Sequence, residues 1–212
     1  PIEDGCDREM KKKRLWVALK TINPFVNDCL FSYLNCMYDQ KTHSQKDIPG
    51  VTITVPEFGS TYAVDSLDPN WPISLATKAF HDLIKKFEKL GYEDGVDMLG
   101  APYDWRYFSF DTNPFQVEKK NNWFQMTKDL IEKTHTETGK KVVIISHSMG
   151  GLMTFKLLDY VGKEFADKHI EMWICMSAPF LGAVKAVAAA FPGDNLGLPL
   201  HEDLVRKLAR TV

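Results

Sequence analysis

One serine of this chain lies where it can act as a nucleophile. Ser148 follows the apolar run of residues 141–146 and comes directly before a helical pattern that starts at about Met149. Ser146 and Gly150, two positions away on either side, are small, so a strand and a helix can pass closely around a sharp turn. Such a turn makes the serine hydroxyl project above a sheet. The backbone N–H of Met149 then points to where the negative oxygen of an acyl-transfer intermediate develops.

The order strand, His-Ser-Met-Gly, helix is that of the nucleophile elbow of α/β-hydrolases. The first position of that motif is usually Gly, and here it is Ser146, which is also small. The alternative interpretation is a strand-to-helix turn without chemistry. His147 lies on the elbow beside Ser148 and is badly placed to take its proton, so we interpret it as a packing or hydrogen-bonding residue.

The other catalytic groups of such a site follow the serine in the sequence. In α/β-hydrolases the order is Ser, then Asp or Glu, then His. Asp194 and His201 have this order, but they come before any further strand can form. We therefore expect the catalytic acid and base to be absent from this chain, which begins with Pro1 rather than Met. The chain is then the central part of a longer enzyme, incomplete at both ends and inactive by itself.

Strands and helices alternate along the sequence and would position Ser148. Strands are predicted at 51–55, 96–99, 141–146 and 170–177, and helices at 75–90, 117–137, from about Met149 to Val161, and at 184–190. This alternation predicts a mostly parallel sheet with helices on both faces. Residues 1–50 show no regular pattern, and no domain boundary follows residue 50.

The composition excludes several classes of protein. The 212 residues suffice for one α/β domain with a sizeable core, and 44% are hydrophobic. A net charge of -2 gives no basic excess, so we expect no nucleic-acid partner. The four cysteines form no CxxC pair, and we expect neither a metal nor a cofactor. No apolar run reaches the roughly 18 residues that span a bilayer.

Five segments carry a family resemblance: "VTITVPEFGSTYAVDSLD", "GAPYDWR", "ISHSMGG", "SAPFLGAVKAV" and "PGDNLGLP". In this order they resemble the lecithin:cholesterol acyltransferase family, which includes lysosomal phospholipase A and the phospholipid:diacylglycerol acyltransferases. The resemblance extends from Cys6 to about Pro199. It implies an α/β-hydrolase fold and an acyl-enzyme at Ser148, with the Met149 N–H in the oxyanion hole. The substrate would be a phospholipid at a membrane or lipoprotein surface, and the acyl acceptor water or a lipid alcohol such as a sterol, diacylglycerol or ceramide.

The resemblance also assigns residues 1–50 to a lid that contacts lipid and residues 51–212 to a partial hydrolase domain. It implies a disulfide between Cys6 and Cys29, against the alternative of two unrelated buried thiols. A disulfide favours a secreted, lysosomal or other secretory-pathway location. Within the lid, a basic run precedes the residues expected to bind lipid, namely Leu15, Trp16 and Val17. The alternative is a solvated charge run with one core tryptophan. The two remaining cysteines, Cys36 and Cys175, are expected to be free and buried.

Two of the segments that carry the resemblance contain further residues of interest. Asp104 and Arg106 of "GAPYDWR" are expected to form a charge pair that supports the site rather than to be catalytic. Glu57 of "PEFG" stands where phospholipases of the family often have Gly. Two rival functions remain open: a lipid-binding relative without catalysis, and an esterase for small soluble esters.

Overall fold

The computed structural model describes residues 6, 14–15, 27–41, 44–68, 74, 77–107, 122–194 and 202–211. Its helices are α1 (Asn27–Leu34), α2 (Tyr62–Asp65), α4 (His81–Lys89), α5 (Trp123–Thr138), α6 (Met149–His169), α7 (Val184–Ala190) and α8 (Glu202–Thr211). Its strands are β1 (Cys36–Asp39), β2 (Ser44–Asp47), β3 (Val142–His147) and β4 (Ile170–Met176), and a short 3₁₀ turn, η2, spans Trp105–Tyr107. The described part is therefore a mixed α/β structure.

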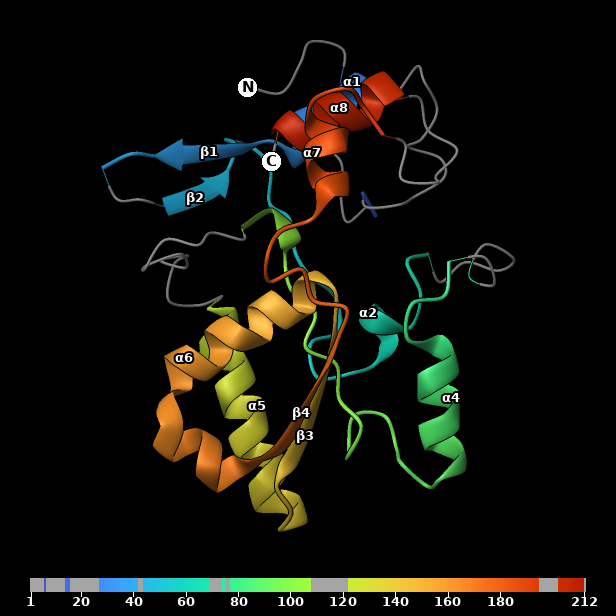
Figure 1. Cartoon of the computed structure of the whole chain (residues 1–212), viewed down its shortest axis with the longest axis vertical. Helices are drawn as coiled ribbons and strands as arrows, with labels where there is room; N and C mark the ends of the chain where they lie inside the picture. Colours follow the sequence, from blue (N-terminus) through green and yellow to red (C-terminus); the bar gives the residue numbers. More distant parts are fainter. Residues whose placement is uncertain are drawn as a thin grey trace.

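A βαβ unit forms the centre of the molecule. β3 and β4 pair in parallel, with Ile144 opposite Trp173 and His147 opposite Met176, and α6 connects them (Figure 1). The sequence therefore predicted the two strands and their parallel pairing correctly. The apolar, β-branched composition of β3 suits a strand with one face packed against helices.

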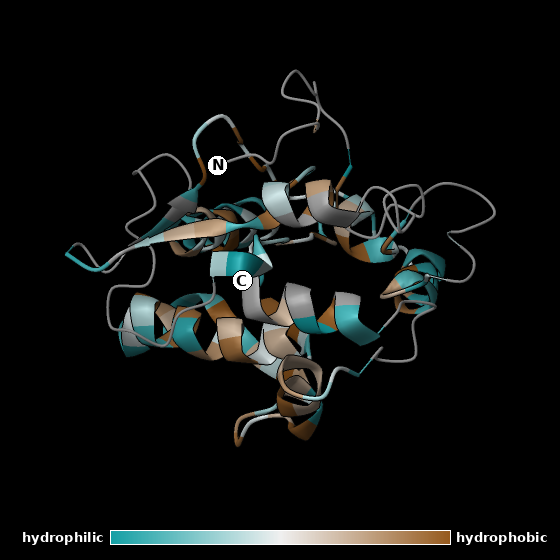
Figure 2. Ribbon diagram, turned by 90° about the horizontal axis from the view of Figure 1, so that it is seen from above, coloured by the Kyte–Doolittle hydropathy of each residue, from teal (hydrophilic) through white to brown (hydrophobic). Residues whose placement is uncertain are grey.

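Helices α5 and α6 cover one face of β3 and β4 and enclose the core (Figure 1). The buried core side chains are Phe124 and Ile131 of α5 and Met153 and Leu157 of α6. Val142, Ile144 and Ile170 of the strands pack against them. Figure 2 shows hydrophilic and hydrophobic residues mixed along the helices of the molecule, the pattern of amphipathic helices that bury one side.

The other face of the β3–β4 pair is more open. Val143, Met172 and Ile174 are exposed there. α2 and α4 lie on this side in Figure 1, and an edge-to-face contact between Phe80 and His147 joins them to the end of β3. Within the described residues, helices therefore pack closely on one face of the sheet, as predicted, whereas the strand residues of the other face are largely exposed.

Helices and strands also occur where the sequence showed no pattern. β1 and β2 pair antiparallel, with Cys36 opposite Asp47, and α8 packs against α1 and α7 (Figure 1). The strands read CMYD and SQKD; each has only four residues, and the second has no apolar residue, so neither shows a period of two. This explains why residues 27–47 seemed irregular in the sequence.

Two predicted strands are absent from the described structure. Residues 51–55 alternate between half-buried and exposed, as their sequence suggests, but no described strand pairs with them. Residues 96–99 fold as a turn, because the amides of Val96, Asp97 and Met98 all donate to the carbonyl of Glu93. Amides engaged in a turn are unavailable for a sheet, and only an isolated bridge from Asp94 to Met98 remains.

The predicted helices are present, α7 with the predicted bounds and the others with shifted ends. α5 starts at Trp123 because the Asn122 side chain accepts from the amides of Phe124 and Gln125, and it stops as predicted at Gly139, whose φ is 67°. α4 starts at His81 rather than 75, since Lys78 bridges to Ser66 instead of continuing a helix. α6 runs past Val161 to His169, with a kink at Gly162.

Candidate active site

Ser148 occupies a strained turn between β3 and α6. Its backbone has φ 53° and ψ -125°, a conformation that L-residues other than glycine rarely adopt, and its side chain is exposed. Strained backbone of this kind persists only where the surroundings enforce it, and it is concentrated at functional sites. The structure thus shows at Ser148 the sharp turn and the exposed hydroxyl that the sequence motif predicts.

Backbone hydrogen bonds on both sides hold this turn. The Ser148 amide donates to the carbonyl of Met176 at 2.9 Å, which continues the β3–β4 pairing by one residue. The Ser148 carbonyl accepts from the amide of Gly151, also at 2.9 Å. Met149 is the first residue of α6, where helical N–H groups have no partner within the helix. Its N–H is therefore available to an oxyanion beside Ser148.

The closest packing at the elbow occurs at Gly151 rather than at Gly150. A Cβ added to Gly150 would lie 3.8 Å from the Cβ of Ser146, an ordinary contact. A Cβ added to Gly151 would lie 2.4 Å from the Cβ of Ala178 and 2.9 Å from the sulfur of Cys175. The second glycine of "SMGG" therefore lets α6 approach the end of β4, a requirement that we did not predict from the sequence.

Ser146 is more than a small residue. It is buried, and its hydroxyl accepts a hydrogen bond from the indole Nε1–H of Trp173 at 2.8 Å. Trp173 is opposite Ile144 on β4, so its side chain lies on the same face of the sheet as Ser146. No local pattern in the sequence pairs these two residues, which are 27 positions apart.

None of the described histidines is bonded to the Ser148 hydroxyl. His147 turns to Phe80, with ring centroids 6.4 Å apart, in agreement with its interpretation as a packing residue. His81 contacts Asp65 at 2.9 Å, and His135 contacts the carbonyl of Lys140. His169 is buried at the far end of α6. Of the weak triad candidates, Asp194 ends a described segment, and His201 lies outside the described residues.

Asp104 and Arg106 form the expected charge pair as part of a larger buried cluster. Arg106 is 3% exposed, and its Nη2 lies 2.6 Å from Asp104 and 2.7 Å from Asp47 of β2. Asp47 also accepts from the Tyr107 hydroxyl at 2.9 Å and from the Ile53 amide at 3.0 Å. The cluster thereby connects the β1–β2 hairpin to the segment that leads into α5.

Burial and the neighbouring charges together determine which groups of the cluster are protonated. Burial by itself would lower the pKa of Arg106, but hydrogen bonds and attraction from Asp104 and Asp47 more than offset it, so the pKa is raised and the side chain stays charged. Burial, followed by the hydrogen bond to Asp47, raises the pKa of Tyr107. Burial also raises the pKa of Cys36, which lies beside the cluster as a free thiol. These groups keep fixed charges near neutral pH and suit a structural role.

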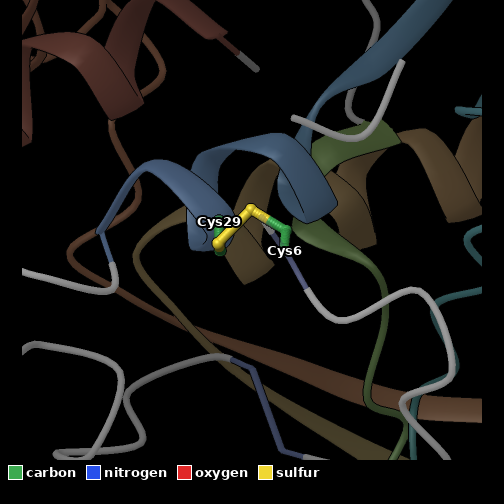
Figure 3. Close-up of a disulfide and its surroundings, with 2 residues drawn as sticks. All are labelled: Cys6 and Cys29. Carbon is green, nitrogen blue, oxygen red and sulfur yellow. A yellow bond between two sulfur atoms is a disulfide. The ribbon is translucent and has the colours of Figure 1, made fainter. Parts of the chain in front are cut away.

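The N-terminal segment contains the expected disulfide. Cys6 and Cys29 are bonded, which ties the region before α1 to that helix (Figure 3). Closing a loop of this separation contributes about 3 kcal/mol to stability by the chain-entropy estimate. Of the residues predicted to contact lipid, Leu15 is half-buried, whereas Trp16 and Val17 lie outside the described residues.

The other two cysteines are free, as expected, but Cys175 is exposed rather than buried. In the described part, β4 has a neighbouring strand on one side only, which leaves this end of the strand open. Glu57 has φ 51°, the left-handed region that favours glycine. The substitution noted at "PEFG" thus falls at a position whose backbone suits the glycine of the related phospholipases.

Two searches of the described residues bear on metals and membranes. No group of three or more His, Cys, Asp or Glu side chains there is arranged to hold a metal ion. Within the same residues, no helix has both the length and the apolar character that a membrane span requires.

Comparison with known proteins gives one consistent result. The chain is 30% identical over 190 residues to the lysosomal phospholipase A and acyltransferase of Bos taurus, a match of 90% of this chain and 44% of the relative. It is 35% identical over 203 residues to the lecithin-cholesterol acyltransferase-like 1 protein of Arabidopsis thaliana, or 93% of this chain and 46% of the relative. It is 33% identical over 190 residues to the phosphatidylcholine-sterol acyltransferase of Gallus gallus, a match of 90% of this chain and 43% of the relative.

The chain thus spans less than half the length of these relatives. The sequence model of one family, lecithin:cholesterol acyltransferase, matches residues 11–212, which include the elbow and the buried Arg106 cluster. The chain belongs to the lecithin:cholesterol acyltransferase family.

Proposed function

We propose that the full-length protein is a serine-dependent phospholipid acyl hydrolase or acyltransferase that forms an acyl-enzyme at Ser148. The observation that carries this proposal is the left-handed, exposed Ser148 at the junction of β3 and α6. The names of the relatives agree with it, since they are a phospholipase A and several acyltransferases. The fold that we propose is an α/β-hydrolase in which β3 and β4 are neighbouring strands of a larger sheet.

The reaction proceeds in two half-reactions. The Ser148 oxygen attacks the ester carbonyl carbon while a histidine takes its proton, and the negative carbonyl oxygen accepts from the Met149 N–H. The C–O bond to the lysophospholipid then breaks, and the histidine returns the proton to the leaving oxygen. Water or a lipid alcohol attacks the acyl-enzyme in the same way and restores the serine. None of the described histidines supplies this base, because His81 and His135 contact other polar groups and His147 packs against Phe80.

The rest of the chain positions and covers this site. Residues 1–50 serve as the lid and residues 51–212 as the hydrolase part, and the Arg106 cluster joins η2 to the β1–β2 hairpin. Leu15, Trp16 and Val17 contact the lipid surface, to which the protein binds peripherally. The disulfide supports a secreted, lysosomal or other secretory-pathway location, because such bonds persist in oxidising compartments.

The test uses the full-length protein and its Ser148→Ala variant. Vesicles of phosphatidylcholine with a labelled acyl chain are supplied alone, or with cholesterol, diacylglycerol or ceramide, and labelled products are separated. We expect acyl release or transfer that falls by at least about 10³-fold in the variant. Turnover of p-nitrophenyl butyrate without any preference for vesicles would instead favour an esterase for small esters. Vesicle binding without turnover of either ester would favour a lipid-binding relative.

A further inference from the structure

A tryptophan on β4 contacts the strand that enters the elbow. The Nε1–H of Trp173 donates to the Ser146 hydroxyl at 2.8 Å, and Ser146 is 6% exposed. Ser146 occupies the position at which the elbow usually has glycine, two residues before Ser148. A glycine has no side-chain acceptor for the indole N–H. The bond therefore exists because this chain departs from the usual motif.

Aromatic contacts hold the indole of Trp173 from the other side. Phe180, in the turn after β4, meets it edge to face with ring centroids 6.2 Å apart. Phe180 in turn meets Phe155 of α6 edge to face, with ring centroids 6.1 Å apart. The indole thus contacts both β3, through the Ser146 hydroxyl, and Phe180 in the segment after β4, although Phe180 and Phe155 are themselves exposed.

Such support is relevant because the elbow is strained. A residue at φ 53° relaxes towards ordinary backbone angles unless its neighbours prevent it. The bonds to Met176 and Gly151 restrain Ser148 through its own amide and carbonyl. The Trp173–Ser146 bond adds a restraint through a buried side chain on the incoming strand.

We propose that the Trp173–Ser146 hydrogen bond positions the nucleophile, by holding the end of β3 so that the Ser148 oxygen keeps its angle of attack. This inference rests on the proposed function, because the position of the Ser148 oxygen affects a reaction rate only if Ser148 is the nucleophile. Both residues act through the backbone of Ser148 and do not touch the ester. Their loss should therefore slow the chemical step without weakening substrate binding.

The experiment compares Trp173→Phe, Ser146→Ala and the double variant in the full-length protein, with phosphatidylcholine vesicles as substrate. We expect each single variant to lower kcat by about tenfold with KM unchanged, since small misplacements of a reacting group have large effects on rate. The double variant should lose no more than either single one, because all three lack the same bond.

A matched control separates positioning from general stability. The Nε1–H of Trp123 donates to the carbonyl of Ala101 at 3.1 Å, at the start of α5. Trp123→Phe also removes one indole hydrogen bond, but this bond makes no contact with the elbow. We expect a lower Tm in this variant with kcat unchanged.

The other possible results would overturn either the positioning role alone or the proposed function as well. Unchanged kcat in an active protein, a rise in KM alone, or additive losses in the double variant would overturn the positioning role and leave the proposed function intact. An inactive wild-type protein would overturn the proposed function and the inference with it. If Trp173→Phe does not fold, the smaller change Ser146→Ala decides the question through its rate of fluorophosphonate labelling at Ser148.

Discussion

Gly151 offers a sharp test of the packing at the elbow. In Gly151→Ala, the new Cβ would lie 2.4 Å from the Cβ of Ala178 and 2.9 Å from the sulfur of Cys175. Carbon atoms in contact usually lie ~3.5–4.0 Å apart, so the first turn of α6 must move away from β4 by about 1 Å. Overpacking of this kind costs about 1–3 kcal/mol of unfolding free energy. A displacement of about 1 Å at a nucleophile lowers its rate by about 10²-fold.

The matched control is Gly150→Ala. Its new Cβ lies 3.8 Å from the Cβ of Ser146, which is ordinary contact. Alanine is also the better helix former, so we expect the free energy of unfolding to be unchanged or higher, by at most about 1 kcal/mol. A second variant, Ala178→Gly combined with Gly151→Ala, removes the nearer clashing atom and should recover part of the lost stability.

The assays are thermal unfolding and acyl release from vesicles, both in the full-length protein. We expect Gly151→Ala to lower both Tm and turnover while Gly150→Ala keeps its Tm. Equal stability and equal turnover in Gly151→Ala and wild type would refute the argument, because the close approach of α6 to Ala178 would then impose no constraint.

Three other perturbations have expected outcomes. Arg106→Met leaves the partly buried carboxylates of Asp47 and Asp104 without their buried cation and should cost about 3 kcal/mol of unfolding free energy. Lys163→Met, at an exposed ion pair, should cost less than about 1 kcal/mol, and equal Tm shifts in the two variants would contradict this. Glu57→Gly relieves a φ of 51° and should raise stability by about 0.5–1 kcal/mol in denaturant titrations, and a lower unfolding midpoint would argue against that backbone conformation. Burial, followed by the charge of nearby Lys168, lowers the pKa of His169 in the folded protein. Near and below about pH 6.5 the unfolded chain therefore binds a proton more readily than the folded chain does, and the free energy of unfolding should fall as the pH drops. In His169→Phe the curve of Tm against pH should be flatter, and parallel curves would exclude this residue as a cause.

The features predicted correctly from the sequence are those that depend on residues close together in the chain. The elbow follows from small residues around Ser148, and the end of α5 from Gly139, because turns and caps are set within a few positions of the chain.

Residues 51–55 show the limit of such patterns. Their alternation persists in their burial, but a strand also needs a partner, and the described residues supply none.

The contacts that sequence patterns missed join distant positions. Asp47 and Arg106 are 59 residues apart, and Ser146 and Trp173 are 27 apart. Each pairing depends on how the elements pack, which no local period encodes. The family resemblance predicted the Cys6–Cys29 disulfide, but it did not indicate that Asp47 completes the charge cluster or that Trp173 reaches the elbow.

The central claim is that Ser148 is an activated nucleophile, and covalent labelling tests it most directly. The full-length protein and its Ser148→Ala variant would be incubated with a fluorophosphonate probe, and the modified peptide identified by mass spectrometry. We predict one labelled site, Ser148, with no labelling in the variant. A folded, lipid-accessible protein that is not labelled, or one labelled equally in the variant, would contradict the account.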